Sequence, residues 1–338
     1  MAGLKPLEHR QYAHCESGVV TSLLKCHGLD LSEPMVFGIS GGLTFAYIPF
    51  IKITNMPVIS YRMLPGSIIK GAEKNLPITF KSMKYREKEL ALTELIQILD
   101  SGEIVGLQTS VYWLPYFPPE MRFQFNAHNL IVYGREGDEF LVSDPVFEHT
   151  VRVRAEDLQN ARFAKGTLAP KGFMYYPLTV NNSIDIQKVI RKSITRTVHM
   201  MLYAPVPFIG VKGIRCMARK IERLKTHREP RYVRLFLGHI VRMQEEIGTG
   251  GGGFRFMYAA FLQEAAQILK SPHLEDASQM MTKAGDMWRR FALACARACK
   301  SKIADFDVRE IARLAQQCAD QEKRVYDHLK SMKPNHAP

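Results

Sequence analysis

The chain has 338 residues, of which 46% are hydrophobic and 23% charged, and its net charge is +13. These values are typical of a globular protein with a full core, and the length favours two domains. No apolar stretch reaches the ~18–20 residues that a membrane-spanning helix needs, and the N-terminus lacks the apolar core of a signal peptide. The six cysteines form no paired framework. We therefore expect a cytoplasmic protein with reduced thiols and no metal site.

The first half of the sequence predicts a mixture of helices and strands. The segment 15–27 has its apolar residues on one helical stripe and is followed by Gly28, which suits the end of a helix. Strands at 128–133 and 139–143 are joined by Gly-Arg-Glu-Gly-Asp, a connection typical of hairpins. The aromatic, proline-rich segment 112–125 is expected to be a loop. The other expected elements are a short helix from Glu33, helices at 70–75 and 87–101, and strands or buried segments at 43–53 and 104–109.

The second half consists of long amphipathic helical patterns with few strand signals. The segment 178–183, Leu-Thr-Val-Asn-Asn-Ser, is predicted to be the linker between the two halves. The sequence thus predicts an α+β domain at residues 1–180, followed by an all-α domain at residues 181–338. The expected helices of the second domain are 184–202, 214–227, 232–247, 254–270, 277–298 and 308–332.

Basic residues recur every few positions between Lys188 and Arg234, with few acids among them. Such a surface attracts an anionic partner, whether nucleic acid, anionic lipid or an acidic protein. A solvated helix face accounts for the pattern equally well. Because no nucleic-acid-binding signature accompanies the charge, we expect no specific nucleic-acid binding.

Three residues, in chain order, are those of a cysteine-based catalytic triad. Cys15 opens the first helix, His128 begins a strand, and Asp144 follows the next strand. The positive end of a helix dipole stabilises a thiolate, and an imidazole accepts the thiol proton best when a carboxylate fixes its tautomer. If the two strands pair as a hairpin, Asp144 reaches His128. We therefore predict Cys15 as nucleophile, His128 as its base and Asp144 as the orienting group.

Each of these residues also has a purely structural interpretation. A free cysteine is often an inert core residue, although the polar neighbours of Cys15 favour a nucleophile. His128 could simply cap a strand, and Asp144 before a proline is a common way to begin a turn. The order of the three residues along the chain is what favours catalysis.

Several motifs resemble a known family. The segment 14–47, HCESGVVTSLLKCHGLDLSEPMVFGISGGLTFAY, resembles the opening of the butirosin-biosynthesis acyltransferase family. The segment 248–266, GTGGGGFRFMYAAFLQEAA, is similar to that family's companion C-terminal domain. The cysteine-led helix, with HNLIVYG at 128–134 and FLVSDP at 140–145, also resembles the papain-like cysteine peptidases that process bacteriocin leaders. The resemblance implies a papain-like, cysteine-peptidase-type fold for residues 1–180, followed by the helical domain.

The resemblance also implies an activity. An acyl group would pass from the phosphopantetheine thioester of an acyl carrier protein to Cys15, and from there to an amine or alcohol in a biosynthetic pathway. The phosphopantetheine arm would arrive with the carrier protein, so no bound cofactor is expected. Carrier proteins are acidic, and the basic residues of the second half would then face a partner. The second partner would be a small-molecule acyl acceptor. The sequence leaves undecided whether the chain forms a homodimer through its helical half.

The group that would stabilise the oxyanion is less well defined. The peptidases place a glutamine several residues before the cysteine, whereas Gln11 stands only four residues before Cys15. His14 or backbone N–H groups are the alternatives.

Four further residues are candidates for contact with substrate. The run containing Gly41 and Gly42 lacks the Lys-Ser/Thr of a nucleotide-binding loop, so we expect a bend with close backbone approach beside the substrate. Tyr47 belongs to the same segment. Trp113 could line an acyl pocket, together with the other aromatic residues of its loop, Tyr116, Phe117, Phe123 and Phe125, although aromatic loops also cover ordinary cores. The glycine run 248–253 is either an interhelix linker or an anion-binding nest.

Three functions remain to be compared. Acyl transfer is favoured. A peptidase or amidase would use the same triad and differ only in letting water reach the acyl-enzyme. A basic scaffold without chemistry ranks last, because all three triad residue types are present.

Overall fold

The computed structural model describes residues 7–181, 183–224, 229–300 and 307–332. By contacts the chain forms unit 1, which comprises Met1–Val36 and Pro65–Ile184, and unit 2, which comprises Phe37–Leu64 and Asp185–Pro338. This division differs from the expected boundary between residues 180 and 181, because the segment 37–64 groups with the C-terminal helices.

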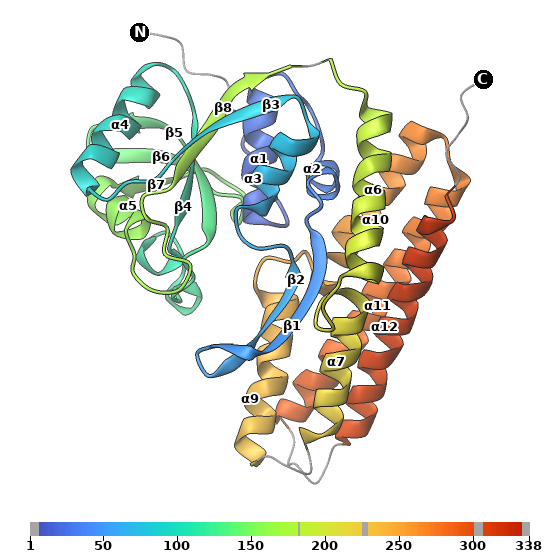
Figure 1. Ribbon diagram of the computed structural model, residues 1–338. Helices are drawn as coiled ribbons and strands as arrows, with labels where there is room; N and C mark the ends of the chain where they lie inside the picture. Colours follow the sequence, from blue (N-terminus) through green and yellow to red (C-terminus); the bar gives the residue numbers. More distant parts are fainter. Residues whose placement is uncertain (1–6, 182, 225–228, 301–306, 333–338) are drawn as a thin grey trace. The chain divides into compact units, whose positions relative to one another are not determined.

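Unit 1 is an α+β unit around a six-stranded antiparallel sheet with the order β3-β8-β4-β5-β6-β7 (Figure 1). The helix α1 packs against β4, β5 and β8. Alternate residues of β4, β5 and β6 form a separate core with α4 and α5. The helices are α1 (Cys15–Cys26), α3 (Ser67–Asn75), α4 (Lys88–Asp100) and α5 (Ala155–Arg162), and α2 (Glu33–Ile39) leads from unit 1 into unit 2. The strands are β3 (Ile78–Met83), β4 (Val105–Thr109), β5 (His128–Glu136), β6 (Glu139–Ser143), β7 (Val151–Arg154) and β8 (Met174–Val180).

The helix α1 is buried from its first residue through Leu24. Gly18 allows Tyr12 to approach this helix closely, because a Cβ on Gly18 would lie only 2.7 Å from the side chain of Tyr12. The aromatic segment 112–125 forms a loop, as expected, with short 3-10 turns at Val111–Trp113 and Pro119–Met121.

The prediction of a linker at residues 178–183 was partly wrong. Its first three residues complete β8, where Val180 pairs with Ile78 of β3. Leu178 is 61% exposed, so the segment lacks the buried pattern of a strand, yet the ladder of backbone hydrogen bonds holds it in the sheet. Residue 182 lies outside the described residues.

In its described residues, unit 2 is helical apart from one two-stranded hairpin, β1 (Leu43–Ile53) and β2 (Met56–Arg62). The helix α11 contacts α9, α10 and α12, and α12 also contacts α6 and α7. Within residues 185–224, 229–300 and 307–332, the helices are α6 (Ile186–Tyr203), α7 (Gly210–Glu222), α9 (Pro230–Val241), α10 (Arg255–Leu269), α11 (Pro272–Lys300) and α12 (Val308–Lys330), with a π-helical turn η3 at Arg242–Glu246 and a 3-10 turn η4 at Gly252–Phe254. The end predicted for the helix 214–227 falls partly outside the described residues.

Aromatic side chains of the hairpin explain why residues 37–64 belong with the helices. Phe45 stacks on Trp288 with 5.7 Å between ring centroids, and Tyr61 meets the same indole edge-on at 5.2 Å. Tyr47 meets Phe236 of α9 edge-on at 6.4 Å. All three hairpin rings are buried, so burial of this large apolar area stabilises the hairpin on the helices.

A buried ion pair lies in the same core. Arg255 Nε donates to Glu322 Oε1 at 2.8 Å, and neither side chain is exposed. Trp288 Nε1 donates to the same carboxylate, while the carbonyl of Gly253 accepts from Arg255 at 2.6 Å. A buried pair is tolerated when its remaining polar atoms find partners, as these do.

The glycine run 248–253 is packed rather than being a free linker. Gly250, Gly251, Gly252 and Gly253 all have positive φ, and a Cβ on Gly253 would lie 2.3 Å from the Tyr61 ring. The N–H of Gly252 donates to the carboxylate of Glu245 at 3.2 Å. An internal carboxylate therefore binds where the sequence suggested an anion nest.

No helix in the described part of the chain has both the length and the apolar character needed to cross a membrane.

Candidate active site

The topology of unit 1 brings the three predicted triad residues to one place. Cys15 is the first residue of α1, next to its N-cap His14. His128 is the first residue of β5 and pairs with Thr109 of β4. Asp144 directly follows β6, and the β5–β6 hairpin returns it toward the start of β5. All three are buried: Cys15 is 8% exposed, His128 3% and Asp144 0%.

The imidazole and the carboxylate are in direct contact. His128 Nε2 lies 2.7 Å from Asp144 Oδ2. The other carboxylate oxygen, Oδ1, accepts from the Val146 N–H at 3.0 Å. Because Nε2 faces Asp144, Nδ1 is the nitrogen of His128 that remains to exchange a proton with a thiol.

The thiol of Cys15 lies close to the backbone that leads into His128. Its Sγ lies 4.0 Å from the carbonyl oxygen of Ala127, the residue before His128. Burial alone would lower the pKa of His128, but the charge and hydrogen bond of Asp144, with a smaller contribution from Cys15, raise it to about 10. The imidazole is therefore held as a cation at neutral pH, close to the Cys15 thiol at the N-terminus of α1.

The aromatic loop encloses the pair. Tyr116 donates its O–H to Asp144 Oδ2 at 2.9 Å. The ring of Phe117 meets His128 edge-on, with 5.5 Å between centroids, and packs against Phe147 at 4.9 Å. Of the aromatic residues of this loop that the sequence indicated, Tyr116 and Phe117 contact the pair, whereas Trp113 is 43% exposed.

A buried carboxylate that sequence reasoning missed holds the start of α1. Glu33 Oε2 accepts from the Ala13 N–H and Oε1 from the His14 N–H, each at 2.9 Å. Oε1 also accepts from the Ser17 hydroxyl at 2.7 Å. Burial raises the pKa of Glu33, and these hydrogen bonds oppose the shift. Glu33 therefore binds residues both before and after Cys15 in the sequence.

The two oxyanion candidates have other partners. Gln11 is exposed, and its amide donates to the carbonyl of Val146 at 2.9 Å, beside the Asp144 turn. His14 is buried, and its Nδ1 accepts from the Ser17 N–H at 3.2 Å as the cap of α1. In this arrangement both side chains stabilise the surroundings of the triad, and an oxyanion role for either stays a prediction.

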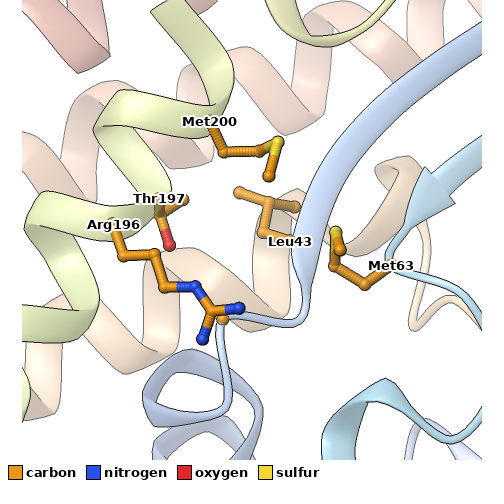
Figure 2. Close-up of a pocket in the computed structure, with 6 residues that line it drawn as sticks. Leu43, Met63, Arg196, Thr197 and Met200 are labelled. Carbon is orange, nitrogen blue, oxygen red and sulfur yellow. The ribbon is translucent and has the colours of Figure 1, made fainter. Parts of the chain in front are cut away.

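Three of the four substrate candidates belong to unit 2. Gly41 has φ +67° and lines a small hollow together with Leu43 and Met63. On the other side of the hollow Arg196, Thr197 and Met200 project from α6, and Figure 2 shows the Arg196 side chain extending toward the segment that precedes β1. The remaining two, Gly42 and Tyr47, are packing positions: a Cβ on Gly42 would lie 2.6 Å from the Phe37 ring, and Tyr47 is buried.

The described residues form no ligand set of the kind that holds metal ions in proteins. There, no group of three or more His, Cys, Asp and Glu side chains is arranged to hold a metal ion. All six cysteines are free thiols.

Two family descriptions match the chain. Residues 14–145 match "Butirosin biosynthesis protein H, N-terminal", and residues 156–329, just over half of the chain, match "Domain of unknown function (DUF4872)". No curated protein matches the sequence. Among solved structures, a Bacillus anthracis protein described as a C39-like peptidase is similar at 14% identity and a TM-score of 0.37, over 54% of this chain and 98% of that chain. The chain therefore belongs to the DUF4872 family, and its residues 14–145 carry the match to the butirosin biosynthesis protein H N-terminal domain.

Proposed function

We propose that the protein is a cysteine-dependent acyltransferase that takes an acyl group from the phosphopantetheine thioester of an acyl carrier protein and passes it to an amine or alcohol. The observation that carries the proposal is the contact of His128 with Asp144 at 2.7 Å, with the Cys15 Sγ 4.0 Å from the carbonyl oxygen of Ala127, the residue before His128. The match of residues 14–145 to the butirosin biosynthesis family supports transfer as the reaction.

Acylation would begin at the sulfur of Cys15. The Cys15 thiolate attacks the thioester carbonyl, and the resulting oxyanion collapses as the C–S bond to the carrier breaks. The His128 imidazolium gives its proton to the departing pantetheine sulfur. The products are a Cys15 thioester, a carrier thiol and a neutral His128.

The second step reverses the proton movement. An amine attacks the Cys15 thioester while neutral His128 takes the amine proton. Collapse of the tetrahedral intermediate breaks the bond to Sγ, forms the amide, and restores the thiolate–imidazolium pair. Asp144 orients the imidazole in both steps and stabilises its charged form.

A labelling experiment tests the acyl-enzyme. The purified protein is incubated with a panel of acyl-loaded carrier proteins and acyl N-acetylcysteamine thioesters, and intact mass is measured. We expect one acyl adduct, absent in Cys15→Ala and retained in Cys26→Ala, a half-buried thiol at the other end of α1. An adduct that persists in Cys15→Ala, or none with any donor, contradicts the proposal.

The fate of the adduct distinguishes transfer from hydrolysis. A panel of amines added to the acylated protein should give amide faster than free acid appears. If free acid forms at the same rate without an amine and no amide is detected, the protein is a hydrolase of the peptidase or amidase type.

The exposed basic face of α6 is where we propose that an acidic carrier protein docks. Lys188, Lys192 and Arg196 are exposed on this helix, which contains no acidic residue. Lys192→Glu should raise the KM for the acyl-loaded carrier several-fold and leave acylation by the small thioester unchanged, because charge at an interface rim mainly affects encounter. Equal effects on both donors would argue against docking there.

A further inference from the structure

The outer half of β1 exposes a continuous run of apolar side chains. Phe50 is 67% exposed, Ile51 49% and Ile53 39%. Successive residues of a strand point to opposite faces, so the hairpin presents apolar surface on both faces. Single exposed hydrophobic residues are common, whereas a contiguous group marks an interaction surface.

Packing and a backbone hydrogen bond hold the inner half of the hairpin on the rest of unit 2. The inner half of β1 is buried from Leu43 to Tyr47, and the Tyr47 N–H donates to the carbonyl of Phe208 at 2.9 Å. The Phe50 ring meets Phe208 edge-on at 5.3 Å between centroids. Figure 1 shows the turn of the hairpin extending away from the helices of unit 2. The exposed residues therefore project from the unit as part of a fixed element.

In the sequence around the run, the charged residues are basic. Lys52 is exposed between Ile51 and Ile53, and residues 34–72 contain no aspartate or glutamate. The neighbouring helix α9 contacts β2, and its His239 Nε2 lies 3.0 Å from the carbonyl oxygen of Pro57. Two residues of α9, Arg231 and Leu235, are also exposed. Apolar and basic groups are thus combined on one part of a chain whose net charge is +13.

We propose that the outer half of the β1–β2 hairpin binds the surface of an anionic lipid bilayer. Phe50, Ile51 and Ile53 would enter the boundary between headgroups and acyl chains, and Lys52 would contact anionic headgroups. The inference goes beyond the acyl transfer proposed above, since it uses no residue of the triad. Binding through so few apolar residues is weak and reversible.

Two features favour a lipid surface over a second copy of the chain. A fluid bilayer surrounds an inserted element and accommodates apolar side chains on both of its faces, whereas docking on a protein covers mainly one. Pro49 and Pro57 each lack a backbone N–H, which hinders addition of a further strand to the hairpin. The excess of positive charge complements anionic headgroups and repels an identical chain.

Vesicle co-sedimentation of the full chain tests the proposal. We expect binding to vesicles of equimolar phosphatidylcholine and phosphatidylserine, little binding to phosphatidylcholine alone, and weakening at high salt. Phe50→Ser and Ile51→Ser should each reduce the partition coefficient about tenfold, the value of one large apolar side chain. The control Leu293→Ser, at an isolated position on α11 that is 51% exposed, should bind as the wild type does.

Several outcomes would overturn the inference. These are no binding of the wild-type chain to either vesicle, equal losses in Leu293→Ser and Phe50→Ser, or unchanged binding of both hairpin variants. Light scattering could show that the wild-type chain is a dimer, that Phe50→Ser is a monomer, and vesicle binding could be absent. In that case the hairpin would be the interface with a second copy of the chain. Ile53→Ser, which leaves the Phe50–Phe208 contact in place, guards against loss of fold in Phe50→Ser. Acylation of Cys15 in the hairpin variants reports separately on the proposed function.

Discussion

Tyr116 and His128 share one oxygen of Asp144. The phenol donates to Oδ2 at 2.9 Å, and His128 Nε2 lies 2.7 Å from the same atom. Burial, together with the nearby Asp144 charge, raises the pKa of Tyr116 well above 10, so the phenol stays protonated and acts as a donor. The carboxylate thus has a donor on Oδ2 that competes with the imidazole, besides the Val146 N–H on Oδ1.

Removing that phenol should change both stability and reactivity. In Tyr116→Phe the Asp144 carboxylate loses a donor that competes with the imidazole, so it should hold the His128 imidazolium more tightly and raise the pKa of His128 further. The His128-dependent limb of the pH profile for Cys15 alkylation should therefore move to higher pH. The free energy of unfolding should fall by about 1.5–3 kcal/mol, the contribution of a hydrogen bond to a charged group.

The matched control is Tyr112→Phe, in the same loop. Tyr112 is 47% exposed, so the same substitution should leave the pH profile and the unfolding free energy unchanged. Identical behaviour of the two variants would show that Tyr116 does not tune the pair.

The His128–Asp144 pair should make stability depend on pH. Because the pKa of His128 is raised from 6.5 to about 10 in the folded state, its contribution is fully present below about pH 6.5 and is lost as the pH rises toward about 10. Urea unfolding of the wild type should therefore give a decreasing free energy of unfolding across this range. In His128→Gln the decrease should be smaller, and an equal slope in both proteins would contradict the folded-state pKa.

The meeting of His128 and Asp144 was predictable because it depends on local pairing. The hairpin signal at residues 134–138 fixes β5 against β6, with Glu136 opposite Glu139, and this register carries the two residues to one end. The helix α1 was predictable from its apolar stripe and the following Gly28. The catalytic roles themselves stay predictions.

Other features depend on contacts between distant segments, which periodicity does not encode. The segment 37–64 joined the helical unit because Phe45 and Tyr61 pack on Trp288, more than 200 residues away in the sequence. The sequence predicts a short helix beginning at Glu33. The hydrogen bonds of Glu33 with the backbone before Cys15 follow only from the fold. The fold class, an α+β region followed by helices, was nonetheless predictable, since it depends on the succession of patterns along the chain.

Glu33 should be needed to hold the nucleophile in place. Glu33→Gln keeps one oxygen but turns an NH₂ group toward backbone N–H donors, so at least one of its bonds to Ala13, His14 or Ser17 is lost. We expect a loss of about 1–3 kcal/mol in the free energy of unfolding and slower alkylation of Cys15 by iodoacetamide. Glu156→Gln, an exposed carboxylate at the start of α5, should change neither quantity. Normal alkylation in Glu33→Gln would limit this residue to a role in stability.

The packing of the glycine run against the hairpin gives a last prediction, which separates steric contact from backbone strain. Gly253 has φ +58°, and a Cβ there would lie 2.3 Å from the Tyr61 ring. Gly248 has a similar φ of +52° with nothing within 4 Å of its Cβ position. Alanine at either position carries the left-handed penalty of about 1–2 kcal/mol, but only Gly253→Ala must also displace a buried aromatic ring. That displacement adds about 1–3 kcal/mol.

Urea unfolding of the two variants measures the difference directly. Gly253→Ala should be less stable than Gly248→Ala by about the overpacking cost alone, since the backbone strain is common to both. Because Tyr61 contacts Trp288 edge-on, the fluorescence of that buried indole should also change in Gly253→Ala and not in Gly248→Ala. Equal stabilities would mean that the hairpin moves away from the glycine run without loss, and that the close approach at Gly253 does not hold the hairpin on the helices.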